Sequence, residues 1–235
     1  MRLRSLWAIL LALILILTSV RVTLGIDWSF LWQPKLDGAK IAAGLKEALK
    51  IGTENTVRQA GQVDGFYQNP TIKILLPDQL LKMEKVLRQL GLGAQVDQFV
   101  LSLNRAAERA TPAAKDIFWG AIKEMTFEDA ITIFKGNDTA ATDYFQDKTS
   151  AKLRTAFLPA VSQATDEADV TRIYKQITLE IGKIKFLNYN PIDIDEYIVI
   201  KTLDGLFYLL GEEERKIRQD PAARVTKLLK EVFGS

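Results

Sequence analysis

The chain has no cysteine and no histidine among its 235 residues, which removes several kinds of chemistry at once. Without cysteine there are no disulfides, no thiolate nucleophile and no sulfur ligand for a metal. Without histidine there is no histidine-ligated haem or zinc, and neither Ser-His-Asp nor Cys-His catalysis can operate. The fold must therefore be held by packing, and carboxylates are the remaining candidates for catalysis or for binding a hard metal ion.

An excess of basic charge is also absent once the first 25 residues are set aside. Arg2, Arg4 and Arg21 lie in that segment, which contains no acidic residue. Removing these three from the 31 basic residues leaves 28, against 29 acidic residues, so the remainder has a net charge of −1. A protein that neutralises a phosphate backbone needs an excess of basic side chains, and we therefore expect no nucleic-acid partner.

Residues 1–25 have the layout of an export signal, a basic tip followed by an apolar core. The run from Leu6 to Leu17 is wholly apolar, and residues 5–20 carry no charge. Cleavage before Ile26 would make the segment a signal peptide. An uncleaved segment would be an N-terminal membrane anchor, associated with the inner membrane through residues 5–20. A buried N-terminal helix is the third interpretation, and the first two predict a periplasmic or exported protein.

Residues 26–37 read as a juxtamembrane or linker segment between this leader and the rest of the chain. Trp28, Phe30 and Trp32 are predicted to lie either at the membrane interface or against the core of the domain. Residues 38–235 fit the size of one domain, and we predict a single helical domain there.

Apolar residues recur at helical spacing through most of residues 38–235. Thr126 with Asp129 has the spacing of a capping box at the start of a helix. Residues 64–77 interrupt the periodicity and predict either one short β-hairpin or an ordered loop. We therefore predict an all-α fold, an irregular bundle of about nine or ten helices. The clearest helical stripe comprises Val96, Phe99, Val100, Leu103, Ala107 and Ala110.

Local patterns predict three finer features of the bundle. A short helix over residues 139–145 is separate from the next helix, near residues 150–161. A long helix begins around Asp195, and its later part carries Glu214 and Arg218 as an i,i+4 pair on a charged face. The inward side of that helix is predicted to comprise Ile200, Leu203, Phe207 and Leu210.

Two polar residues, Asn104 and Glu108, lie one helical turn apart beside an apolar stripe. If they are buried they need partners, such as Arg58 or Arg105. The pattern favours a buried structural network over a ligand site.

The acidic residues are the other candidates for a site, and several stand next to a tyrosine. Grouped carboxylates could bind calcium or magnesium, or perform general acid/base chemistry, if the segments 138–145 and 195–198 meet in one cleft. The competing interpretation is that Asp129, Asp138 and Asp195 stabilise the first turns of helices. We expect no resident metal and no cofactor. The full set of candidate binding residues is Asn104, Glu108, Asp129, Asp143, Tyr144, Asp195, Glu196, Tyr197 and Asp204.

Several strings resemble a bacterial family of exported proteins, catalogued as domain of unknown function 4197. They are GLKEAL (44–49), GFYQNPTIKILLP (65–77), LNRAAE (103–108), TFEDA (126–130), DTAATDYF (138–145), DEYI (195–198), LDGLFYLLGEEERKIRQDPAAR (203–224) and LLKEVFG (228–234). The resemblance covers essentially all of residues 38–235. It implies export and a helical fold, but it brings no activity, substrate or catalytic residue.

Export, the missing catalytic motifs and the near-neutral charge together favour a non-enzymatic periplasmic module that binds an envelope protein or another ligand. The alternative is a divalent-metal-binding protein or a hydrolase that uses carboxylates of residues 138–145 and 195–198. That alternative requires Asp143 to converge with Asp195 or Glu196 in one cleft.

Overall fold

The computed structural model describes residues 37–167, 170–183 and 190–234, which form one compact unit. The predictions for residues 1–25, and for residues 26–36 of the linker, lie outside the described residues. Within the described ranges the chain is built from helices and contains no strand, which confirms the all-α prediction. None of these helices is long and apolar enough to cross a membrane.

Most of the helices follow one another with short connections, and the longest connection that the structure describes throughout is the loop at residues 62–77. That segment is an ordered loop and not a hairpin. The elements are α2 (Gly38–Gly61), α3 (Asp78–Gln89), α4 (Gly93–Ala110), the 3-10 helix η2 (Thr111–Ala113), α5 (Ala114–Glu124), α6 (Phe127–Lys135), α7 (Ala140–Glu167), α8 (Val170–Gly182), α9 (Ile194–Gln219), the 3-10 helix η3 (Pro221–Ala223) and α10 (Lys227–Phe233).

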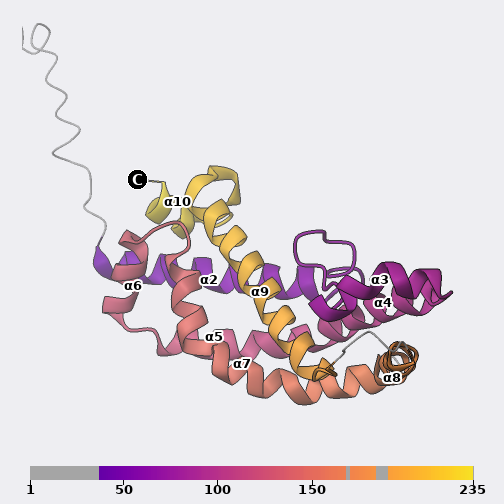
Figure 1. Cartoon of the computed structure of the whole chain (residues 1–235). Helices are drawn as coiled ribbons and strands as arrows, with labels where there is room; N and C mark the ends of the chain where they lie inside the picture. The colour runs from indigo at the N-terminus through magenta and orange to yellow at the C-terminus, as the bar shows by residue number, and fades with distance from the viewer. Residues whose placement is uncertain (1–36, 168–169, 184–189, 235) are drawn as a thin grey trace, which may run out of the picture. The chain divides into compact units, whose positions relative to one another are not determined.

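Four long helices, α2, α4, α7 and α9, carry most of the packing (Figure 1). Helix α9 runs obliquely between α2 and α7 and packs against both. The shorter helices pack around them: α3 lies against α4, α8 against α4 and α7, and α10 against α2. Each buries one apolar stripe, which is the arrangement expected of amphipathic helices in a bundle.

Helix α7 is continuous from Ala140 to Glu167, so the prediction of two separate helices there is wrong. Pro159 lies inside it, where proline removes one backbone hydrogen bond. Packing against α4, α5 and α9 offsets that loss and keeps the helix in one piece. Just before the helix, the Asn137 side chain, and not Asp138, accepts the Thr139 N–H at 3.0 Å.

The first turn of α7 is instead held by a carboxylate from another helix. Glu214 of α9, predicted on a charged surface, is 8% exposed and accepts the N–H groups of Ala141 and Thr142 at 3.0 and 2.9 Å. Arg218 bonds Glu214 at 2.8 Å and donates to the carbonyl of Ile133 at the end of α6. Glu214 thus lies at the positive N-terminal end of the α7 dipole, and Arg218 lies at the negative C-terminal end of the α6 dipole.

The inward side of α9 differs from the prediction at one position. Ile200 is 44% exposed, whereas Leu206 and Leu210 are buried. The buried stripe contains Ile198, Val199, Thr202, Leu206, Leu209 and Leu210. The predicted stripe begins at Ile200, next to the buried Val199, and its later members Phe207 and Leu210 lie in the core.

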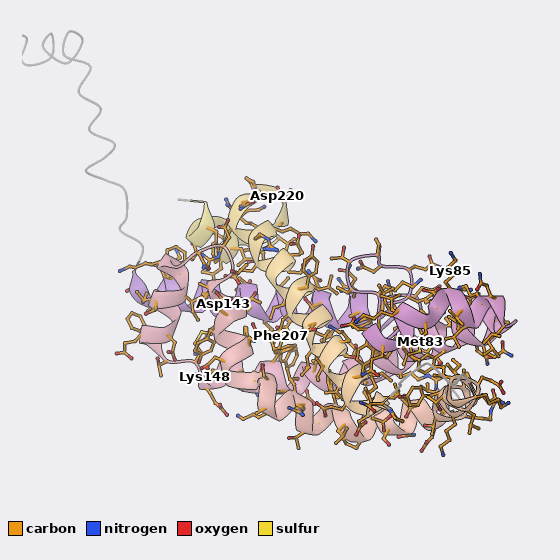
Figure 2. The ribbon with its side chains drawn as sticks, viewed as in Figure 1. Met83, Lys85, Asp143, Lys148, Phe207 and Asp220 are labelled. Atoms are coloured by element: carbon orange, nitrogen blue, oxygen red, sulfur yellow. The ribbon has the colours of Figure 1, made fainter. Side chains whose placement is uncertain are left out.

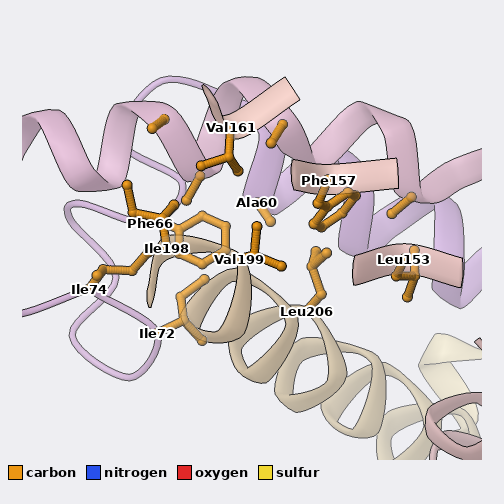
Figure 3. Packing of buried hydrophobic residues seen from close by; sticks show 14 of the residues in the cluster. Ala60, Phe66, Ile72, Ile74, Leu153, Phe157, Val161, Ile198, Val199 and Leu206 are labelled. Carbon is orange, nitrogen blue, oxygen red and sulfur yellow. The ribbon is translucent and has the colours of Figure 1, made fainter. Parts of the chain in front are cut away.

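The 62–77 loop contributes its own apolar side chains to the core. Phe66, Ile72 and Ile74 are buried, and Figure 3 shows them packed beside Ile198 and Val199 of α9. One side of the loop is therefore buried in the core. This packing fixes the position of the exposed side.

Candidate functional site

The chain turns sharply into the loop at Asp64 and Gly65. Asp64 has φ of 67°, a left-handed conformation that aspartate tolerates better than most residues. A Cβ added at Gly65 would lie 2.3 Å from the Gln59 carbonyl oxygen, so only glycine fits this close approach to α2.

Glu108 of α4 holds the first part of the loop. Its side chain is almost fully buried, and its Oε1 accepts the N–H groups of Phe66 and Tyr67, both at 3.1 Å. The other oxygen bonds Arg105 at 2.6 Å, and Arg105 bonds Asp64 at 2.6 Å. The buried carboxylate is thus paired and hydrogen-bonded, which offsets the cost of removing it from water.

Asn104, one turn earlier on α4, holds the second part of the loop. Its side-chain oxygen accepts the Ile74 N–H and its amide donates to the Ile74 carbonyl, both at 2.8 Å. The same amide donates to the Val100 carbonyl at 2.7 Å. The predicted network of Asn104 and Glu108 therefore exists, with Arg105 and not Arg58 as the ionic partner, and its purpose is to position the loop.

Helix α9 holds the loop from the opposite side. A Cβ added at Gly205 would lie 2.7 Å from the Phe66 ring, so glycine lets the loop approach α9 closely. The Tyr197 hydroxyl donates to the Leu75 carbonyl at 3.0 Å. Burial, together with the negative charge of Asp78, raises the pKa of Tyr197 to about 12, so the hydroxyl keeps its proton at neutral pH.

The raised pKa of Tyr197 predicts a late step in the alkaline titration of the full-length chain. Between pH 10 and 12 the unfolded chain loses this proton and the folded chain retains it, so stability falls as the pH rises through that window. Absorbance of tyrosinate should show a step near pH 12 that disappears in Tyr197→Phe. Tyr144→Phe should retain that step, and a step that persists in Tyr197→Phe would contradict the assignment.

The outer side of the loop, with the start of α3, forms a partly apolar surface that we call the loop face. Leu75 is 52% exposed and Leu81 is 44% exposed. Two grooves meet at these leucines, one toward Tyr197 and Lys201 and one toward Arg88. The Lys73 ammonium lies 4.0 Å from the centre of the Tyr67 ring at the edge of this surface.

Two other predicted residues meet at the start of α6. Asp129 and Thr126 form the predicted capping box, with bonds of 2.9 and 3.0 Å. The Tyr144 hydroxyl approaches Asp129 at 3.4 Å. Hydrogen bonds from Thr126 lower the pKa of Asp129, which suits a helix cap.

The remaining predicted acids lie at separate places. Asp195 accepts a bond from Thr165 at 2.9 Å, and Glu196 lies 2.6 Å from Arg154. Asp204 is exposed and pairs with Lys201 at 3.3 Å. Asp143 is exposed, and Figure 2 shows it well apart from Met83 and Lys85 of α3.

The expected convergence of Asp143 with Asp195 or Glu196 is wrong. Asp143 lies in the first turn of α7, whereas Asp195 contacts Thr165 near its last turn. At about 1.5 Å per residue these two points of the helix are roughly 30 Å apart. No group of three or more acidic residues in the described ranges could hold a metal ion.

Sequence reasoning missed the exposed leucines and the buried Glu214. The sequence does contain a signal for Leu75. Ile72, Ile74 and Leu76 are spaced two residues apart and face the core, so Leu75 between them faces outward. No such signal existed for Glu214, since its i,i+4 arginine is equally typical of a solvated helix face.

Comparison with known proteins gives one family. The model of the family described as Protein of unknown function (DUF4197) matches residues 35–234. No curated protein and no solved structure matches the chain. Since the match spans most of the sequence, the chain belongs to the family of proteins of unknown function DUF4197.

Proposed function

We propose that this protein is an exported, non-enzymatic interaction module of the bacterial envelope, and that the loop face binds a protein partner there. The proposal rests on two exposed leucines: Leu75, on a loop whose position is fixed by buried polar side chains, and Leu81, in the first turns of α3. Exposed apolar side chains on a pre-positioned backbone are what a protein interface requires.

The chemistry of the chain supports binding over catalysis. Histidine and cysteine are absent, and the acids of residues 138–145 and 195–198 do not share a cleft. The buried carboxylates Glu108 and Glu214 are each occupied by backbone N–H groups and an arginine. Neither is available as an acid, a base or a metal ligand.

The interaction is tested by photocrosslinking from the full-length chain in living cells. Benzoylphenylalanine is placed at Leu75 or Leu81, and at Leu179 or Val225 as equally apolar, exposed controls elsewhere on the fold. We expect the same discrete adduct from the first two positions and none from the controls. Leu81→Asp should weaken the crosslink formed from Leu75, because a charge would be buried at the interface.

Adducts that form equally from all four positions, or from the control positions alone, would contradict the assignment of the loop face. Export is tested separately with alkaline phosphatase fused after Ser235, because this reporter needs disulfides that form only outside the cytoplasm. The fusion should be active, and removal of residues 1–25 should abolish its activity. Equal activity with and without the leader would contradict export.

A further inference from the structure

The short segment from Ile72 to Leu76 has the burial pattern of a β-strand although it pairs with no strand in the described chain. Ile72, Ile74 and Leu76 are buried, Lys73 is partly buried and Leu75 is exposed. Side chains that alternate between two faces at every residue indicate an extended backbone. Pro77 closes the segment at the start of α3.

Asn104 occupies one edge of this extended segment. Its side-chain amide bonds both the N–H and the carbonyl of Ile74, which is the pairing a neighbouring strand would provide. On the opposite side the Lys73 N–H donates within the loop, to the Asn69 carbonyl at 2.9 Å, so the outer edge comprises the Lys73 carbonyl and the polar groups of Leu75. There the Leu75 carbonyl accepts the Tyr197 hydroxyl at 3.0 Å.

Two backbone groups remain open on that outer edge. Among the described residues, neither the Lys73 carbonyl nor the Leu75 N–H has a hydrogen-bond partner. The Lys73 carbonyl and the Leu75 N–H flank Ile74. A single residue of an added strand can bond both of them, donating its N–H to the carbonyl and accepting from the N–H with its own carbonyl. Backbone groups presented in this way select an extended peptide over a helix, whose own backbone is already paired.

An open groove lies beside this edge, between the segment and the α9 residues Tyr197 and Lys201, and leaves the edge accessible to such a peptide. Among its lining residues Lys73 and Lys201 are basic and Asp78 is acidic. Lys73 has no carboxylate partner in the described chain, and Lys201 makes only an exposed pair with Asp204 at 3.3 Å. The charge of the groove therefore suits a peptide that carries a carboxylate.

We propose that the loop face binds an extended, acidic peptide segment of a partner protein, which adds a strand along the outer edge of Lys73–Leu75. This inference rests on the proposed function and specifies its partner. The peptide backbone pairs with the Lys73 carbonyl and the Leu75 N–H, and an exposed side chain of the peptide packs on Leu75.

The test uses random dodecapeptides displayed on phage and selected on the full-length chain in non-ionic detergent. The tightest peptides are synthesised and their affinities measured by fluorescence anisotropy. Leu75→Pro deletes the N–H donor and preserves an extended backbone, and we expect it to weaken binding at least tenfold. Leu75→Ala retains the donor and should weaken binding less. Glu212→Ala, whose surface pair with Arg215 lies outside the residues that line both grooves, should leave the affinity unchanged.

A scan of N-methylated peptides provides a second readout that does not depend on folding of a variant. Methylation removes one peptide N–H at a time, and we expect a strong loss at the one position whose N–H pairs with the Lys73 carbonyl and small losses at the residues on either side. Comparable losses at several positions three or four residues apart, or a loss at none, would overturn strand addition. So would a peptide that binds Leu75→Pro, shown to be folded by circular dichroism, as tightly as the parent chain.

Self-association of the chain that Leu75→Pro abolishes would assign the edge to a second copy and overturn a foreign peptide. A selection that yields no peptide sensitive to Leu75→Pro would also overturn the proposal. Binding that Leu75→Asp abolishes, but that no single N-methylation weakens strongly, would overturn strand addition and leave the proposed function standing. The proposed function itself fails only in the crosslinking experiment.

Discussion

Replacing Glu108 by alanine is expected to lower the free energy of unfolding by about 3–5 kcal/mol, as when one partner of a buried ion pair is removed. The substitution leaves the N–H groups of Phe66 and Tyr67 without an acceptor. It also leaves Arg105 with only Asp64 as a partner. Urea unfolding of the full-length chain in detergent measures the loss.

The matched control for Glu108 is Glu84→Ala, which removes an exposed ion pair with Arg88. That change should cost less than about 1 kcal/mol, because solvent screens exposed pairs. Glu108→Gln should fall between the two, since it retains an acceptor for the loop and loses the charge. A Glu108→Ala chain as stable as Glu84→Ala would mean that the loop does not depend on this carboxylate.

Replacing Glu214 by alanine is expected to be as damaging, about 3–5 kcal/mol, for a similar reason. Its oxygens bond the N–H groups at the start of α7 and the hydroxyl of Thr142, at distances of 2.9–3.0 Å. Removal leaves these donors and the largely buried Arg218 without a carboxylate. Since α7 packs on five other α-helices, its first turn is expected to fray and the urea midpoint to fall.

Glu212→Ala is the control for Glu214, two residues away on the same helix. Glu212 pairs with Arg215 at the surface, so its loss should cost less than about 1 kcal/mol. A similar effect of the two substitutions would show that Glu214 contributes as a surface charge and not as the cap of α7. Hydrogen exchange of the Ala141 and Thr142 amides should accelerate only in Glu214→Ala.

The all-α fold could be predicted because helical periodicity and caps are local properties of the sequence. The capping box of Thr126 and Asp129 illustrates this, since its residues are three apart. The continuity of α7 between residues 145 and 150 could not be predicted, because distant packing, and not local propensity alone, decides whether neighbouring helical segments join into one helix.

Only part of the polar network around Asn104 and Glu108 could be predicted, for a related reason. Asn104 and Glu108 stand on an apolar stripe, so burial and a need for partners follow from the pattern. Their partners are backbone groups of Phe66, Tyr67 and Ile74, and backbone groups leave no trace in the side-chain sequence. The same limit hid the bonds from Glu214 to the start of α7.

The 62–77 loop is held from inside by buried hydrogen bonds and presents an open backbone edge outside. Residue-resolved amide hydrogen exchange on the full-length chain tests this arrangement most directly. We predict slow exchange at Phe66, Tyr67 and Ile74, whose N–H groups bond buried side chains, and fast exchange at Leu75, whose N–H is open. Uniformly fast exchange along the loop, or a protected Leu75 amide in the free chain, would contradict the account.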